Sequence, residues 1–436
     1  MYNTQITTKI QTNYTLFLLA TSFLGVQLIY IDTNILKLSP YRFLIILAPL
    51  LLMKWYKESF PYLRGGINYS YFMFLLFWAF YSLSTALLVA DVAAWLKYNL
   101  FFISGIISSI FIGLFFTKKE DFIKAFRIIE ILSIFLGIIG YYEIFTGNYN
   151  FISQDNQDWY FNALNVIGYR IPITIFYNPN DYALFCLFSF YISLILFMTQ
   201  TNHVNRLISC LNCISLIFLL IATQSRGGFV ALLISAPFVI YSFYRLTNIG
   251  HRLWIAISAL FILIVERSGW LFYIYGDVYS SLTTFDLAGG DVTRINLIKN
   301  GLIFLKDSYY LGTGLGNIEY HMGHSAVYYV GWIRNIHNWW MEILVSSGVL
   351  IFAIYVYLYI RNVWLLYKLP KITCDREVAL ISIPLLGFTT AFVVSSMSSS
   401  SHFTSEWLWP SVALIYAFVN YAYNAESINN ASFSGK

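Results

Sequence analysis

The sequence predicts an all-α membrane protein, a multi-pass bundle of about twelve transmembrane helices. Composition is the first reason: 58% of the 436 residues are hydrophobic and only 11% are charged, whereas soluble domains carry about 25% charged residues. The second reason is that apolar runs of about 20 residues, the length that crosses a bilayer, recur from Tyr14 to Tyr423. Continuous apolar runs fit helices and exclude the alternating strands of a membrane barrel.

The predicted spans follow one another closely, so the whole chain, 1–436, is predicted to be one integral membrane domain. The first apolar run is too long for a cleavable signal peptide, and no small-x-small cleavage site follows it. The ninth span is short, because Glu266 and Arg267 follow it. The spans are 14–31, 36–53, 69–89, 96–116, 128–146, 179–199, 208–223, 228–243, 253–265, 338–360, 378–397 and 407–423.

The distribution of Lys and Arg predicts which loops are cytoplasmic. With the N-terminus inside, the inner segments hold 16 of the 26 Lys and Arg residues and the outer segments hold nine, with Arg42 within a span. Positively charged loops stay on the cytoplasmic side of a membrane. Both termini are therefore predicted to be cytoplasmic. The net charge of +5 reflects this bias and does not indicate a nucleic-acid partner.

Two predicted outer loops, about 147–175 and 267–334, are long. Loops beyond about 15 residues are usually functional or disordered, and the aromatic and apolar residues throughout these two argue against disorder. In the second loop, DVTRINLIKNGLIFLKD predicts an amphipathic helix with Asp291 as its N-cap. We expect it to lie along the outer membrane interface and to cover the bundle. Its predicted apolar face consists of Ile295, Ile298, Leu302 and Leu305.

Two outer arginines are candidates for binding an anion. Arg226 lies in TQSRGGFVALL, where Gly227 and Gly228 are expected to let the chain reverse tightly and a ligand approach the backbone. Its guanidinium either reaches lipid headgroups or forms a fork for a substrate phosphate. Arg294 falls in the first turn of the predicted loop helix, where backbone N–H groups would add donors for an anion. Alternatively, it is an ordinary exposed residue of that helix.

A third arginine precedes a cluster of Asn and Asp residues. Arg170 lies ten residues before Asn180 in GYRIPITIFYNPNDYALF. Asn178, Asn180 and Asp181 are natural capping residues at the start of the span at 179–199. The same side chains could equally bind sugar hydroxyls.

Three histidines, His321, His324 and His337, lie within seventeen residues. The HMGH spacing could suit two metal ligands, but no Cys or Glu completes a zinc signature, so no metal is expected. LGTGLGN at 311–317 is not expected to be a dinucleotide-binding loop, because no strand–turn–helix unit surrounds it. It is predicted to form a compact turn. His337 begins a span. It is either an interfacial residue or a base that accepts a proton from a hydroxyl, since its ordinary pKa is near physiological pH.

Several motifs, in this order, resemble the O-antigen ligase and O-antigen polymerase group of bacterial membrane glycosyltransferases. They cover about 170–350, the predicted catalytic region, whereas the N-terminal third is similar only as hydrophobic architecture. The motifs are NPNDYA after the fifth span, SRGG between two spans, R-x-x-L from Arg294 followed by DSYYLGTGLGN, and Asn335–Asn338 leading into a helix with Glu342 and Gly348.

The resemblance implies an inverting glycosyl transfer from an undecaprenyl-diphosphate-linked oligosaccharide to a sugar hydroxyl, at the outer face of the bacterial cytoplasmic (inner) membrane. It implies that Arg226 and Arg294 bind the donor diphosphate and that His337 orients or deprotonates the acceptor hydroxyl. No nucleotide sugar, other cofactor or catalytic metal is expected. A flippase and a chain-length regulator of the same pathway are the expected protein partners. Further substrate-binding candidates are Arg170, Asn180, Arg334 and Asn338.

The charge of the outer segments favours one activity within this group. They hold nine Lys and Arg against twelve Asp and Glu, a balance of about −3, and so lack the positive field that would attract a phosphorylated lipid A–core acceptor. The prediction is a polymerase of a surface polysaccharide (O-antigen, capsule or exopolysaccharide), and the alternative is an O-antigen ligase. A transporter is disfavoured, because the spans hold few ionisable residues at mid-depth.

Overall fold

The computed structural model describes residues 7–32, 37–87, 89–151, 170–176, 178–247, 289–331 and 333–434. Within these ranges the chain is almost wholly helical, which confirms the predicted all-α class. The strands described are β1 (Ile31–Asp32) and β2 (Lys37–Leu38), an antiparallel pair with Ile31 opposite Leu38. The predicted span at 253–265 lies outside the described residues, as do 152–169 and 267–288 of the two predicted outer loops.

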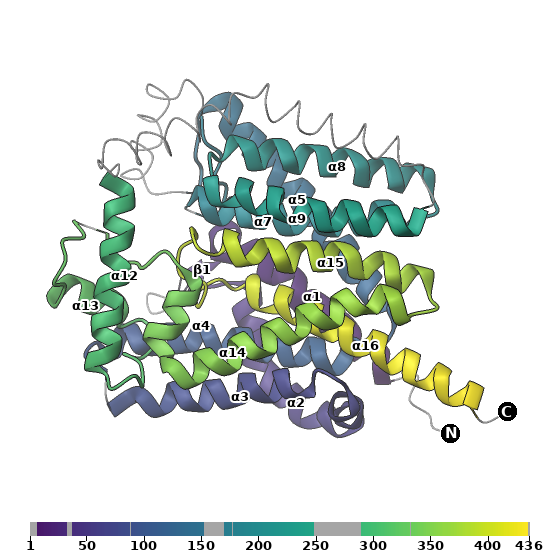
Figure 1. The fold of residues 1–436 in the computed structure, drawn as a ribbon, viewed down its shortest axis with the longest axis horizontal. Coiled ribbons are helices and arrows are strands. Elements are labelled where there is room, and N and C mark those ends of the chain that lie inside the picture. Colours follow the sequence, from purple (N-terminus) through teal and green to yellow (C-terminus); the bar gives the residue numbers. More distant parts are fainter. Residues whose placement is uncertain are drawn as a thin grey trace.

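Long helices form a bundle, and two further helices stand at one end of it (Figure 1). The end helices are α12 (Gly289–Asp307) and α13 (Ile318–His324), and α12 runs across the direction of the bundle. The bundle helices are α1 (Thr7–Leu28), α2 (Pro40–Gly65), α3 (Tyr69–Ser84), α4 (Val92–Phe115), α5 (Lys119–Thr146), α7 (Pro179–Thr199), α8 (His203–Ala222), α9 (Arg226–Thr247), α14 (Trp339–Ile372), α15 (Arg376–Ser395) and α16 (Leu408–Ser434); the short 3-10 helix η1 (Thr85–Leu87) follows α3.

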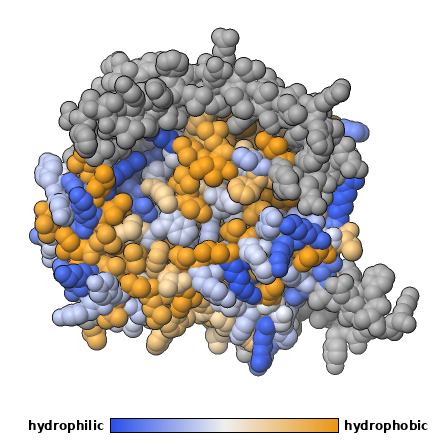
Figure 2. All heavy atoms as spheres, viewed as in Figure 1, coloured by the Kyte–Doolittle hydropathy of each residue, from blue (hydrophilic) through white to orange (hydrophobic). Residues whose placement is uncertain are grey.

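Six of the described helices are long and apolar enough to cross a membrane: α3 with η1, α4, α7, α8, α14 and α15. The predicted spans at 14–31, 36–53, 128–146, 228–243 and 407–423 coincide with α1, α2, α5, α9 and α16. Large apolar side chains also lie on the outside, for example Phe80 and Phe145, which are 73% and 76% exposed. Figure 2 shows hydrophobic residues over much of one face of the bundle. Such an extended apolar surface is suited to lipid.

Arg42 occupies the end of a helix, although the sequence places it within a span. It lies in the first turn of α2, and its Nε donates to Glu406 Oε1 at 2.7 Å. The partner lies just before α16, so this ion pair joins the start of α2 to the α15–α16 connection. The charge is therefore neutralised beside a helix terminus.

A glycine breaks α14 close to its start. Gly348 has φ +81°, in the left-handed region, and a Cβ there would lie 2.5 Å from the carbonyl oxygen of Leu311. The segment LGTGLGN fills this break: Thr313 N donates to Val345 O at 2.9 Å, and Gly314 N donates to Ser346 O at 3.0 Å. Positive φ values at the three glycines of this segment agree with the predicted compact turn. The first turns of α14 are thereby attached to the connection between α12 and α13.

The helix predicted in the second outer loop is present as α12, but its predicted apolar face is only partly correct: Leu305 is buried and Ile298 is partly buried. Ile295 and Leu302 are 41% and 47% exposed, whereas Leu297 and Phe304 are buried. The reason is a close approach at Gly301, where a Cβ would lie 2.9 Å from Ile336 Cδ1. The helix begins at Gly289, earlier than the predicted cap at Asp291. Its inner face packs in a small cluster with Ile318, Met322, Val330, Ile336 and Val345.

Candidate active site

A run of serines between α15 and α16 organises the end of the bundle that carries α12. Residues 396–402, SMSSSSH, are called the serine loop here. Asp181, in the first turn of α7, accepts hydrogen bonds from the backbone N–H of Ser400 at 2.9 Å and from its hydroxyl. The Asp181 side chain is 9% exposed. The N-cap of α7 is Asn178, so these bonds are not part of the cap, and Asp181 ties the start of α7 to the serine loop.

The start of α14 is tied to the same loop. Glu342, 5% exposed, accepts hydrogen bonds from the Ser401 hydroxyl and from His402 N at 3.3 Å. Trp339 N donates to Ser396 O at 3.0 Å. A buried carboxylate is costly without donors, so the Ser401 hydroxyl and the His402 backbone N–H stabilise Glu342 in this position. Burial lowers the pKa of His402 to about 3, and its ring is therefore neutral.

His337 lies against the serine loop from the α14 side. Its φ is +47°, a left-handed conformation that is uncommon for residues other than glycine. Burial lowers the pKa of His337, and the charge of Arg294 lowers it further, while a hydrogen bond with the backbone of Ser399 opposes both effects. The imidazole is therefore mostly neutral at neutral pH and able to accept a proton.

Arg226 approaches the serine loop from the α9 side. It is the first residue of α9 and is exposed. A Cβ at Gly227 would overlap the hydroxyl of Ser398, so the glycine allows α9 to touch the loop. The Ser225 hydroxyl donates to Asn180 Oδ1 at 2.8 Å, which links this turn to α7.

The expected role of the two glycines in SRGG is corrected. Both Gly227 and Gly228 lie inside α9, and the left-handed residue of the turn is Gln224, with φ +57°. A Cβ at Gly228 would lie 3.1 Å from Ala183 Cβ. The glycines therefore provide close packing on α7 and the serine loop, and Gln224 provides the reversal.

Three predicted residues thus gather around neighbouring positions of one loop. Arg226 is followed by the glycine that abuts Ser398, His337 bonds to Ser399, and Arg294 is close enough to His337 to lower its pKa. Arg294 is exposed and is the sixth residue of α12. It therefore lies beyond the first turn, so the free N–H groups of that helix end are not beside it, contrary to expectation.

The other candidates have described contacts of their own. Arg170 Nη1 donates to the carbonyls of Phe145 at 2.6 Å and Ile144 at 3.4 Å, at the C-terminal end of α5. Asn338 is the N-cap of α14 and accepts from Met341 N at 3.1 Å. The guanidinium of Arg334 lies over Gly323 of α13: a Cβ there would be 3.1 Å from Arg334 Cζ.

The two histidines of HMGH have aromatic neighbours. His324 stacks on Tyr320 with ring centroids 4.3 Å apart, and its Nδ1 lies 2.8 Å from Tyr320 O. His321 packs against Phe304 at 5.3 Å. Over the described ranges, no group of three or more His, Cys, Asp or Glu side chains is placed to hold a metal ion.

Aromatic rings pack next to the serine loop and the start of α14. Trp339 directly follows the N-cap Asn338, and its ring centroid lies 5.0 Å from that of Phe403, the residue after the serine loop. Beneath them Phe102 lies 4.9 Å from Trp78 and 5.0 Å from Trp409. Interlocked edge-to-face rings of this kind add stability beyond their buried area. They fix the chain on either side of the polar groups.

Sequence reasoning missed the serine loop and the two buried acids that it binds. Asp181 was considered only as a cap or sugar ligand, and Glu342 only as part of a motif. A signal was present in the sequence: six of the eight residues 395–402 are serines, which would be unusual in a segment that faced lipid. A polar run between two apolar spans indicates a segment with its own hydrogen-bond partners.

Fold and site define an integral membrane protein whose polar groups gather at one end of an apolar helical bundle. Residues 211–356 match the family model described as O-antigen ligase. The chain is also 28% identical over 354 residues to the teichuronic acid biosynthesis protein TuaE of Bacillus subtilis (strain 168), a match covering 80% of this chain and 71% of that protein. These matches confirm the predicted resemblance to the O-antigen ligase and polymerase group.

Proposed function

We propose that the protein polymerises a bacterial surface polysaccharide by moving glycan from undecaprenyl diphosphate to a hydroxyl of another lipid-linked repeat unit. The placement of the three residues near the serine loop supports this proposal: Gly227, next to Arg226, abuts Ser398, while His337 bonds to the Ser399 backbone and has its pKa lowered by Arg294. Two guanidinium groups suit a diphosphate, because each presents a fork of donors to phosphate oxygens. A neutral imidazole beside them suits a hydroxyl nucleophile.

The proposed reaction is a single displacement. The acceptor hydroxyl oxygen attacks the anomeric carbon of the donor, and the bond from that carbon to the diphosphate oxygen breaks. The electron pair of the broken bond stays on the leaving diphosphate, where Arg226 and Arg294 stabilise the growing negative charge. The hydroxyl proton passes to the imidazole of His337. The products are the lengthened glycan, inverted at the anomeric carbon, and undecaprenyl diphosphate.

The choice of polymerase rests on charge. A ligase acceptor such as a phosphorylated lipid A–core would gain from a broadly cationic outer surface, but the predicted outer segments hold twelve acids against nine bases. In a polymerase both substrates carry the same diphosphate anchor, so a few arginines near one site suffice. The ligase is the second candidate, because the family model that matches residues 211–356 is described by that activity.

Deleting the gene tests the polymerase proposal. We expect surface glycan in the deletion strain to consist of single repeat units, and a plasmid copy of the wild-type gene to restore long chains. Electrophoresis of surface polysaccharide and mass spectrometry of the lipid-linked pool measure both. Long chains that accumulate on undecaprenyl diphosphate without reaching an acceptor would instead establish the ligase.

The site is proposed to face away from the cytoplasm, with both termini inside. The turn between α14 and α15 lies at the end of the bundle away from α12 (Figure 1) and is flanked by Lys371 and Arg376, which favours a cytoplasmic position. Cys374, in this turn, is exposed, whereas Cys186 is buried and the other two cysteines are partly buried.

Native Cys374 therefore reports the orientation. We expect a membrane-impermeant maleimide to label the protein in inside-out vesicles but not in intact spheroplasts. Cys374→Ser should abolish the labelling in vesicles, which assigns the signal to this residue. Labelling of intact spheroplasts that disappears in Cys374→Ser would reverse the proposed topology.

A further inference from the structure

His337 needs support to keep its position. Its left-handed backbone is an unfavourable conformation for a residue with a Cβ. Such a conformation persists only where the surroundings fix it. The groups that fix it can be identified from the hydrogen bonds that lead away from the residue.

Asn335 provides the first of these bonds. Its Oδ1 accepts the backbone N–H of His337 at 2.8 Å, and its Nδ2 donates to Glu319 Oε1 at 3.1 Å. Both ends of the amide are therefore used, and the amide can satisfy both partners in only one orientation. Asn335 thereby couples the His337 backbone to α13.

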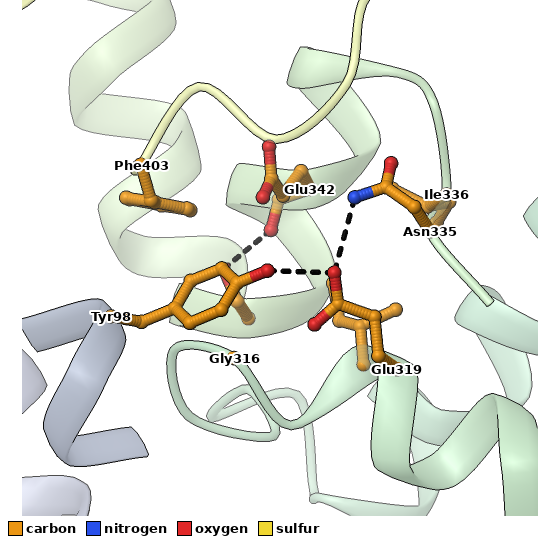
Figure 3. A pocket seen from close by; sticks show the side chains of 9 residues that line it. Tyr98, Gly316, Glu319, Asn335, Ile336, Glu342 and Phe403 are labelled. Atoms are coloured by element: carbon orange, nitrogen blue, oxygen red, sulfur yellow. Dashed lines mark hydrogen bonds between the residues drawn. The ribbon is translucent and has the colours of Figure 1, made fainter. Parts of the chain in front are cut away.

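Glu319 receives a second donor from the bundle. Tyr98 Oη, on α4, donates to the same Oε1 at 2.7 Å. Figure 3 shows the carboxylate between the tyrosine hydroxyl and the Asn335 amide, in a small cavity also lined by Glu342 and Phe403. One carboxylate oxygen thus joins a transmembrane helix to the segment that carries His337.

The residues just before α13 contact the start of α4 directly. Asn317 Oδ1 accepts the backbone N–H groups of Ala90 at 3.0 Å and Asp91 at 2.8 Å, just before α4 begins. A Cβ at Gly316 would lie 2.7 Å from the Tyr98 ring. Because α4 is a bundle helix, Glu319 is held against a fixed support.

We propose that Tyr98, Glu319 and Asn335 form a positioning network that holds His337 where it accepts the proton of the acceptor hydroxyl. This inference rests on the proposed function. The three residues act through the backbone of His337, and the charge of Glu319 is not required: one oxygen that accepts two hydrogen bonds is enough. A carboxamide oxygen at position 319 can do the same.

The test compares Glu319→Ala with Glu319→Gln in the purified full-length protein, using a lipid-linked repeat unit as substrate. We expect Glu319→Ala to lower kcat by about 10²-fold, because small displacements of a reacting group have effects of this size, with little change in KM. Glu319→Gln should restore most of the lost kcat. Tyr98→Phe removes one hydroxyl and keeps the ring, and it should lower kcat less than Glu319→Ala does.

Controls separate this network from general stability and from the proposed function. Glu377→Ala makes the same chemical change at the far end of the bundle, where Glu377 pairs with Lys119 at 2.7 Å, and it should leave kcat unchanged. If Glu319→Ala does not fold, Tyr98→Phe decides: unchanged kcat in that variant overturns the network. Equal loss in Glu319→Gln and Glu319→Ala also overturns it, since charge would then be required. If wild type transfers glycan, His337→Ala does not, and Glu319→Ala matches wild type, only the network is wrong; if wild type transfers none, the proposed function fails.

Discussion

Replacing Arg294 or Arg226 with alanine should lower the rate of glycan transfer by about 10²–10³-fold each, the usual effect of removing one group that stabilises developing charge. The leaving diphosphate gains negative charge as the glycosidic bond breaks. Arg294 is close enough to His337 to lower its pKa, and Arg226 precedes the glycine that abuts the serine loop. Lysine at either position should recover only part of the rate, because an ammonium cannot make the two parallel bonds of a guanidinium. Purified variants, assayed with the lipid-linked repeat unit, measure the effect.

Arg206→Ala is the matched control for these two variants. Arg206 lies in the first turn of α8, and its guanidinium stacks over Phe197 at 4.9 Å, so this substitution removes an arginine that the site does not use. Its rate should equal that of wild type. Wild-type transfer by folded Arg226→Ala and Arg294→Ala would refute the diphosphate-binding role.

Replacing His337 with glutamine should lower transfer by about 10²–10⁴-fold, the usual contribution of a general base. Glutamine can still hydrogen-bond a hydroxyl but cannot hold its proton at neutral pH. Binding of the lipid-linked donor should change little, because the arginines remain. His321→Ala and His324→Ala should keep most of the activity, since those rings pack against Phe304 and Tyr320 instead. Activity retained in His337→Gln would disprove the role of base.

The pH dependence adds a second check on His337. Burial and the Arg294 charge lower its pKa, so the imidazole is neutral at neutral pH, and activity should fall as the pH decreases through that lowered pKa. Arg294→Gln removes one of the two lowering causes. The pKa of His337 should therefore rise towards its ordinary value, and the acid limb of the rate profile should move to higher pH. An unmoved acid limb would show that another group titrates.

Much of the architecture could be predicted, because apolar length is a strong local signal. The helix in the second outer loop was predicted from spacing alone and is present as α12, yet its buried face was predicted only in part: Leu305 is buried, but Ile295 and Leu302 are exposed. Asn300 is fully buried on α12, where its amide bonds to the backbone of Val327 and Tyr328. The face of α12 that is buried depends on the segments that pack against it, here at Asn300 and Gly301. The spacing of apolar residues along one helix does not show these neighbours.

The candidate site likewise has a part that the sequence predicts and a part that it does not. Arg226 and His337 were predicted because each is an ionisable residue where an apolar run begins or ends, and Arg294 because it falls in the first turn of the predicted loop helix. The serine run indicates a polar segment but not its partners, because the loop acts through bonds such as Ser400 to Asp181, 219 positions apart in the sequence. Partners at such separations are found from the folded chain.

The position of the serine loop in the sequence has a consequence for how the protein is made. Chains emerge and fold from the N-terminus, so α7, α9 and α12 are synthesised before residues 396–402 leave the ribosome. Until then Asp181 and Glu342 lack the hydrogen-bond donors that stabilise their buried carboxylates, and the serine loop is not yet present beside α9 and His337. Under the proposed function, we therefore expect a nascent chain in the translocon to be inert towards lipid-linked glycan until the last helices have been inserted.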